Sequence, residues 1–159
     1  MNAVTIRAAT NRDSESIKAL VFIVLEEFGL ASDSSGIDKD LDAIEEHYHS
    51  NRGYFGVIEL DNKIVATVGL ANVDNETCEL RKMYILPDQR GKGLGRYLLE
   101  FSLDKARALG YQRMILETAA PLKSAIAMYK KYGFQPFTPA HLSSRCDQAF
   151  ELNLETKKH

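Results

Sequence analysis

The sequence predicts an α/β domain in which helices cover both faces of a mixed β-sheet. Short β-rich runs alternate with segments of helical periodicity, which is typical of a layered α/β fold. The chain of 159 residues has the size of one domain, and it contains no internal repeat and no linker rich in Gly, Pro or Ser. We therefore expect a single domain over residues 1–154, followed by a frayed tail at 155–159.

The elements are assigned from periodicity and from the residues that start and stop them. A helix is predicted to begin at the capping-box sequence Thr10–Asp13 and to end at Gly29, and later helices stop at Gly110 and Gly133. The predicted helices cover residues 10–29, 41–48, 93–109 and 122–132. The predicted strands cover residues 4–7, 54–60, 64–70, 77–85, 112–117 and 149–154, with a hairpin turn at 61–63 and one further strand expected after the last helix.

Composition and charge argue against several classes of protein. The net charge is −2 and the isoelectric point is near 6.1, so no excess of positive charge favours nucleic acid or an anionic membrane. The N-terminus lacks the features of a signal peptide, and the longest apolar run, Ala19 to Leu25, is too short to cross a bilayer. Cys78 and Cys146 are expected to be free thiols. The sequence predicts a cytoplasmic protein without a metal and without nucleic-acid or membrane partners.

The segment that says most about function is the glycine-rich turn from Leu86 to Arg96. Pro87 ends a strand, and glycines at every second position open the next helix. The unpaired N–H groups and positive dipole end of a helix start favour an anion, and glycines let it approach the backbone. Arg90, Lys92 and Arg96 add positive charge. The spacing matches neither a dinucleotide fingerprint nor a P-loop, and a solvated turn is the alternative interpretation.

Two neighbouring segments complete a set of motifs with this turn. The strand segment 79–85 precedes it and the helical segment 125–134 follows it. Together the three resemble the core of the GCN5-related N-acetyltransferases. The hallmark of that family, Gln/Arg-x-x-Gly-x-Gly/Ala, corresponds here to Arg90, Gly93 and Gly95.

The resemblance implies a fold and a cofactor site. The sheet would be mixed and mostly antiparallel, and its central strands, 77–85 and 112–117, would splay apart to admit acetyl-CoA. The pantetheine arm would pair with the backbone of the first strand, where one N–H group would polarise the thioester carbonyl. The pyrophosphate would bind the turn. The cofactor-binding residues implied are Met83, Tyr84, Ile85, Arg90, Gly91, Lys92, Gly93, Leu94, Gly95 and Arg96.

The resemblance also implies two catalytic residues. Tyr129 matches the family tyrosine that protonates the departing CoA thiolate, which a phenol is able to do. The alternative is that its ring packs into the core beside Ile126. Glu79, eleven positions before Arg90, matches the catalytic glutamate of the histone-acetylating branch and is the candidate base. The alternative is a pair with Arg81 on the same face of the strand.

The acceptor is less well defined. Many family members carry Asn seven positions before the helix tyrosine, where this chain has Leu122, so that contact with CoA is not expected. Segment 26–46 has eight acidic residues against Lys39, which either attract a cationic amine or form solvated helix faces. A small-molecule amine or an amino acid is the first expectation. A protein lysine or N-terminus is the second, and a non-catalytic acyl-CoA sensor is the third. A homodimer is possible, and the sequence does not determine the oligomeric state.

Overall fold

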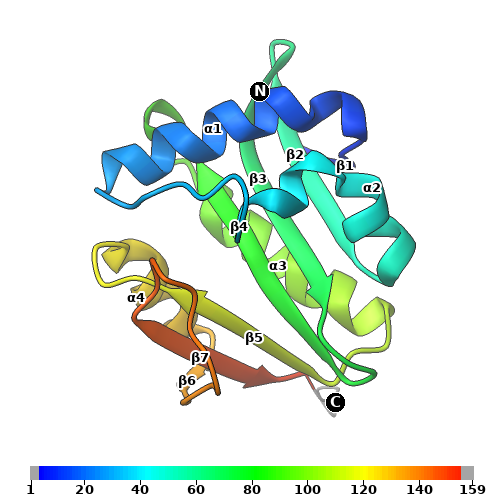
Figure 1. The fold of residues 1–159 in the computed structure, drawn as a ribbon, viewed down its shortest axis with the longest axis vertical. Coiled ribbons are helices and arrows are strands. Elements are labelled where there is room, and N and C mark those ends of the chain that lie inside the picture. Colours follow the sequence, from blue (N-terminus) through cyan, green and yellow to red (C-terminus); the bar gives the residue numbers. More distant parts are fainter. Residues whose placement is uncertain (1–3, 155–159) are drawn as a thin grey trace.

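The computed structural model describes residues 4–154, which contain one seven-stranded sheet of order β1-β2-β3-β4-β5-β7-β6 (Figure 1). All neighbouring strands are antiparallel except β4 and β5. The mixed, mostly antiparallel sheet predicted from the sequence is therefore confirmed. The tail predicted at 155–159 lies outside the described residues. The strands are β1 (Ile6–Ala8), β2 (Tyr54–Leu60), β3 (Lys63–Asn72), β4 (Thr77–Ile85), β5 (Arg113–Thr118), β6 (Gln135–Pro136) and β7 (Gln148–Asn153).

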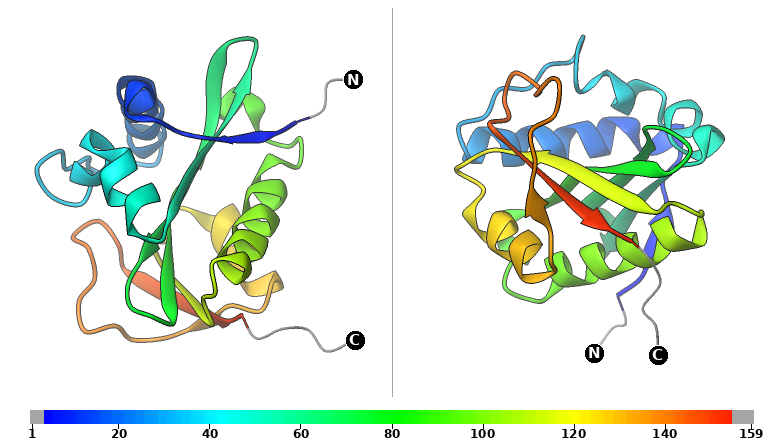
Figure 2. Two further views of the ribbon diagram at one scale, coloured as in Figure 1. Left: turned by 90° about the vertical axis from the view of Figure 1, so that its right-hand side faces the viewer. Right: turned by 90° about the horizontal axis from the view of Figure 1, so that it is seen from below.

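Helices cover both faces of this sheet (Figure 2). The helices α1 (Ser14–Glu27) and α2 (Ile44–His47) lie on one face, and α3 (Leu94–Ala108) and α4 (Lys123–Lys131) lie on the other. Helix α1 packs through apolar residues at helical spacing, as expected for a helix with one buried stripe; these are Ile17, Leu20, Val21, Val24 and Leu25. None of the helices in the described part of the chain is both long and apolar enough to cross a membrane.

The β2–β3 hairpin illustrates how local sequence sets the register. Asp61 and Asn62 form its turn with φ values of 52° and 62°, and Leu60 pairs with Lys63. Two successive positive φ values define a turn whose twist matches that of the flanking strands, and Asp and Asn tolerate this conformation better than most residues. The predicted hairpin is confirmed, although β3 continues to Asn72.

The second predicted helix, at 41–48, is wrong as a continuous element. The chain forms a 3-10 turn at Lys39–Asp42, then α2, and then a second 3-10 turn at His49–Asn51. The apolar residues of this segment are buried as their spacing predicted. However, the buried ion pair of Asp40 with Lys82 draws the segment onto the sheet, and tertiary contacts of this kind outweigh weak helix propensity. The first helix was predicted from residue 10, but a 3-10 turn at Asn11–Asp13 precedes α1, which begins at Ser14. Strands β2 and β4 have their predicted bounds, and the other predicted elements differ from theirs by one or two residues at each end.

The two central strands diverge, as the family resemblance implied. They pair only where Thr77 to Glu79 meets Arg113 to Ile115, whereas the opposite edge of β5 pairs with β7 along its whole length. Strand β4 also carries a bulge. Lys82 and Met83 both lie opposite Val68 of β3, and Lys82 has a positive φ of 54°. Strand β4 thus loses its β5 partner after Glu79, and its pairing with β3 on the other edge is interrupted a few residues later, at Lys82 and Met83.

Candidate active site

Two cavities meet at the point where the central strands diverge. The first, with a volume of about 590 Å³, lies between the two strands and the loops at 36–43 and 143–146, and we call it the loop cavity. The second, of about 360 Å³, lies between the segment 90–95, α1 and the start of α4, and we call it the turn cleft. Both are lined by Met83, Tyr84, Leu122 and Ala125, so the two cavities adjoin beside the bulge of β4.

The turn cleft has the features of an anion site. Gly93 caps α3 with a φ of 84°, no side chain hydrogen-bonds to this cap, and the first turn contains no acidic residue. The first amides of a helix lack intrahelical acceptors, so those of residues 94–96 are open to a ligand. Gly95 has no positive φ, and a Cβ added there would lie 3.5 Å from its nearest neighbour, Ile85 Cδ1. Neither backbone strain nor packing within the chain therefore requires glycine at position 95. A ligand that lies against the start of α3 would require it, because a side chain at this position would occupy the same space.

The three basic residues of the turn do not converge on one point. Arg90 donates to both carboxylate oxygens of Glu27, at 2.5 and 2.8 Å, and to the carbonyl of Ile85, at 2.9 Å. It thereby fastens the turn to the end of α1. Lys92 donates to Gln89 and Arg96 to Glu100, three and four positions away, and both of these hydrogen bonds are exposed. The exposed side chains of Lys92 and Arg96 can reorient toward a ligand, whereas the guanidinium of Arg90 is held by Glu27 and by the carbonyl of Ile85.

Tyr129 lies on α4, in the wall of the loop cavity. It is 6% exposed and its ring packs against Phe134, with centroids 5.7 Å apart. Tyr129 therefore packs its ring into the core, as the alternative interpretation predicted, and it also lies in the cavity wall, where an acid would have to be. Burial, with a smaller effect of Tyr84, raises the pKa of Tyr129. The phenol consequently keeps its proton at neutral pH.

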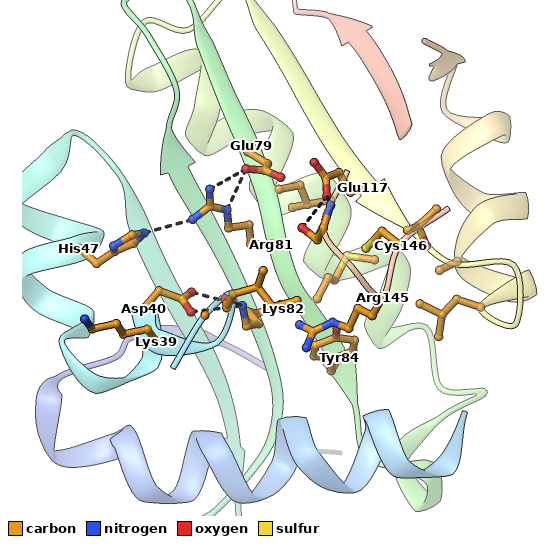
Figure 3. A pocket seen from close by; sticks show the side chains of 18 of the residues that line it. Lys39, Asp40, His47, Glu79, Arg81, Lys82, Tyr84, Glu117, Arg145 and Cys146 are labelled. Atoms are coloured by element: carbon orange, nitrogen blue, oxygen red, sulfur yellow. Dashed lines mark hydrogen bonds and ion pairs between the residues drawn. The ribbon is translucent and has the colours of Figure 1, made fainter. Parts of the chain in front are cut away.

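Glu79 lines the same cavity from β4 and is paired with Arg81. Its Oε1 accepts from Nε and Nη2 of Arg81 at 2.8 and 2.7 Å, and Nη1 of Arg81 donates to Nε2 of His47 at 3.1 Å (Figure 3). The ring of His47 is thus neutral in this arrangement, and burial lowers its pKa. The pair that the sequence offered as an alternative to catalysis is present, and Glu79 still faces the cavity.

A second carboxylate, Glu117, was missed by the sequence analysis. It projects from β5 into the space that Glu79 enters from β4 (Figure 3). Its Oε1 accepts from the N–H and hydroxyl of Ser143, at 2.9 and 2.7 Å. Among the carboxylates that line the loop cavity, Glu117 alone has no ion pair within residues 4–154. The sequence did contain a signal for this residue, because Glu117 lies on the strand that was predicted to diverge from the strand of Glu79.

A buried network of four charges was also missed. Lys82 Nζ lies 3.3 Å from Asp38 and 3.2 Å from Asp40, and Arg145 donates to both oxygens of Asp38 at 2.8 Å. Burial alone would raise the pKa of Asp38, but the hydrogen bond from Arg145 and the charge of Lys82 lower it overall. Two of the acidic residues in segment 26–46, Asp38 and Asp40, are therefore buried against cations of the fold rather than on a solvated helix face. Two more, Glu27 and Asp42, pair with Arg90 and Lys18.

The cysteines are free and neither is activated. Burial raises the pKa of Cys146, in the loop cavity, to about 11, and that of Cys78, in the core, to about 12. Both thiols are protonated at neutral pH and are poor nucleophiles. Within the described residues, no cluster of three or more His, Cys, Asp or Glu side chains could hold a metal ion.

Known proteins share both the sequence pattern and the fold. Residues 21–134 match the acetyltransferase (GNAT) family. The chain is 36% identical to the uncharacterized N-acetyltransferase YjgM of Escherichia coli over 134 residues, which are 81% of this chain and 80% of that protein. Its structure is similar to that of a GNAT-family acetyltransferase from Staphylococcus aureus, with a TM-score of 0.89, 23% identity and coverage of 96% and 100% of the two chains. It is also similar to yncA of Salmonella typhimurium, whose structure contains acetyl-CoA, with a TM-score of 0.73, 22% identity and coverage of 99% and 98%. Because the matched region includes both diverging strands and the glycine-rich turn between them, the chain belongs to the GNAT family of acetyltransferases.

Proposed function

We propose that this protein transfers the acetyl group of acetyl-CoA to the primary amine of a small molecule or amino acid, by direct attack of the amine on the thioester. The observation that carries this proposal is the meeting of the two cavities at Met83 and Tyr84. A thioester placed there would have the rest of CoA in the turn cleft and the acceptor in the loop cavity. The acetyl-CoA in the structure of yncA supports this choice of donor.

The residues of the turn cleft fit CoA. The open amides at 94–96 suit the pyrophosphate, with Lys92 and Arg96 as mobile cationic contacts. The gap between the central strands leaves the edge of β4 from Met83 to Ile85 without a partner strand on the β5 side, so this edge can pair with the pantetheine arm. The carbonyl of Ile85 is the exception, because it already accepts from Arg90. Leu122 lines both cavities and offers an apolar contact where many family members have Asn. Arg90 acts by holding the turn against α1, since its guanidinium is already occupied.

Three proton transfers accompany the reaction. Glu79 and Glu117 hold the ammonium group of the acceptor between them, and Glu79 accepts its first proton directly or through water. The amine then attacks the thioester carbonyl, the new N–C bond forms as the C–S bond breaks, and Tyr129 donates its proton to the sulfur that leaves. The nitrogen gives up its second proton to the Tyr129 phenolate, directly or through water, which restores the phenol. No acyl-enzyme is needed, because the thioester is already activated, and the protonated state of Cys146 agrees with direct transfer.

The loop cavity supports a small acceptor over an extended peptide. It is bounded on several sides by the loops at 36–43 and 143–146, which the buried charge network ties to the sheet. A protein lysine or N-terminal amine is the second candidate, because Glu79 stands where the histone-acetylating branch has its base. A non-catalytic acyl-CoA sensor would need neither Glu79 nor Tyr129 in the cavity.

The decisive experiment is a screen of amines in which the release of free CoA is measured. Amino acids, polyamines, aromatic amines and basic peptides should be tested together with acetyl-CoA. Turnover confined to small amines would support the proposal, and turnover confined to peptides would replace it by the second candidate. If acetyl-CoA raises the melting temperature but no amine is acetylated, the protein is a sensor.

A further inference from the structure

Lys82 has an unusual backbone conformation for a residue in a strand. Four residues other than glycine have a positive φ between positions 4 and 154, and the other three, Arg52, Asp61 and Asn62, lie in turns. A side chain makes this conformation unfavourable, and such residues persist only where the surrounding structure imposes it. The surroundings of Lys82 therefore have to supply the constraint.

The constraint comes from the side chain and the carbonyl of Lys82 together. Nζ donates to the carbonyl of Ile37 at 3.0 Å and lies within 3.3 Å of both Asp38 and Asp40. The carbonyl of Lys82 accepts from the hydroxyl of Thr67 at 2.7 Å. The Lys82 side chain is 4% exposed, so water does not weaken the ion pairs much. The ammonium is anchored on the segment before α2 and the carbonyl on β3.

This anchor acts on the point where the two cavities meet. Because Lys82 and Met83 share one partner position on β3, the regular pairing of β4 is interrupted just before Tyr84. Met83 and Tyr84 line both cavities. The direction in which their backbone groups point is set by the turn of the chain at Lys82.

We propose that Lys82 is a positioning residue for acetyl transfer: its ion pairs with Asp38 and Asp40 hold the bulge that presents the backbone of Met83 to Ile85 to the thioester. The proposal rests on the proposed role of that backbone. Arg145 binds the same Asp38, so the loops that wall the acceptor side belong to the same network. One buried group of charges therefore holds both the loops that form the wall of the acceptor side and the backbone proposed to bind the thioester. Lys82 itself is neither acid nor base, since its ammonium is occupied.

Two substitutions separate positioning from packing. Lys82→Met keeps most of the side-chain length but resists a positive φ, whereas Lys82→Gly adopts a positive φ freely and leaves a void. Both remove the same charge and leave Asp38 and Asp40 in the same condition. If Lys82 positions the backbone, kcat at saturating acetyl-CoA should be about tenfold higher for the glycine variant than for the methionine variant, and both should lie below wild type. The melting temperatures should follow the opposite order.

The proposal is overturned if kcat and melting temperature rank the two variants in the same order, or if Lys82→Met has the kcat of wild type. Lys63→Met, an exposed lysine at the start of β3, is the matched control and should change neither quantity. If Lys82→Met does not fold, Asp40→Asn weakens the anchor without altering β4, and its kcat should fall while acetyl-CoA still raises its melting temperature. An Asp40→Asn enzyme with wild-type kcat would also overturn the proposal.

The rate is measured with the best amine from the screen. If no amine is turned over, the proposed acceptor class has failed, and the variants are compared instead by their slow hydrolysis of acetyl-CoA, followed as free thiol. That reaction needs the same carbonyl polarisation but no acceptor. The order of the two Lys82 variants then tests the positioning role by itself.

Discussion

The turn cleft and the loop cavity share a boundary but are built in different ways. The anion site of the turn cleft depends on the backbone of one short segment, 90–96, and on the absence of side chains at its glycines, although α1, β4 and the start of α4 also contribute to the walls of the cleft. The loop cavity is lined by side chains from loops, helices and both central strands, spread between residues 36 and 146. Backbone recognition leaves a compact motif in the sequence. Recognition by side chains from distant segments leaves none, which is why the cofactor was predicted and the acceptor was not.

The largest effect is expected from Gly95→Val, which tests whether the cleft depends on the missing Cβ. Acetyl-CoA at about 100 times its dissociation constant should stabilise the wild type by about 2.7 kcal/mol, seen as a higher melting temperature. The variant should lose this gain and its turnover, because the side chain would occupy the space over the helix start. Without ligand it should melt close to wild type, since the nearest atom to an added Cβ is 3.5 Å away. A variant that still responds fully to acetyl-CoA would remove the turn from the binding site.

Tyr129→Phe should come next, because it removes a proton donor and keeps the packed ring. Turnover should fall by about 100-fold, the low end for lost acid catalysis, while the acetyl-CoA-induced rise in melting temperature stays unchanged. The raised pKa of Tyr129 also predicts that no alkaline loss of activity below about pH 10 comes from this group. Wild-type turnover, with the chemical step shown to be rate-limiting, would leave Tyr129 with a packing role only.

Glu79→Gln and Glu117→Gln should change different kinetic constants, because Glu79 is proposed to accept a proton and Glu117 to bind the acceptor. Glu79→Gln should lower kcat near neutral pH and recover part of it at high pH, where the amine loses its proton unaided. Glu117→Gln should mainly raise KM for the acceptor, by about tenfold for the loss of one charged hydrogen bond, with KM for acetyl-CoA unchanged. Glu76→Gln, the same substitution in an exposed turn, serves as control. Equal effects of the two variants on kcat and KM would contradict this division.

The smallest effect concerns His47. Because burial lowers its pKa in the folded protein, the unfolded chain takes up a proton at higher pH than the folded one does. The stabilisation is complete well above the ordinary histidine pKa of about 6.5 and is lost as pH falls below it. The melting temperature should therefore drop between about pH 7 and about pH 5, and drop less in His47→Gln. Parallel curves for both proteins would show that the pair with Arg81 does not depend on the neutral ring.

The sequence predicted the parts of the fold in which local chemistry and global structure agree. Strand β4 was placed with its observed bounds, and the helix after the turn within one residue at each end. The prediction for 41–48 failed because the buried ion pair of the preceding residue, Asp40, with Lys82, 42 positions further along the chain, decides the path of this segment. Glu117 and Arg145 were missed for the same reason. Their partners, Ser143 and Asp38, lie on other segments, and no periodicity connects them.

The position of β7 bears on how this protein is assembled during synthesis. Strands β2, β3 and β4 follow one another in sequence and in the sheet, so each can add to the last as the chain emerges from the ribosome. Strand β7 instead lies between β5 and β6, both of which precede it. Until it arrives, one edge of β5 is unpaired and β6 has no neighbour in the sheet. The nascent protein can therefore fold the half that carries the turn cleft before the loop cavity exists, and it exposes an unprotected strand edge in that interval.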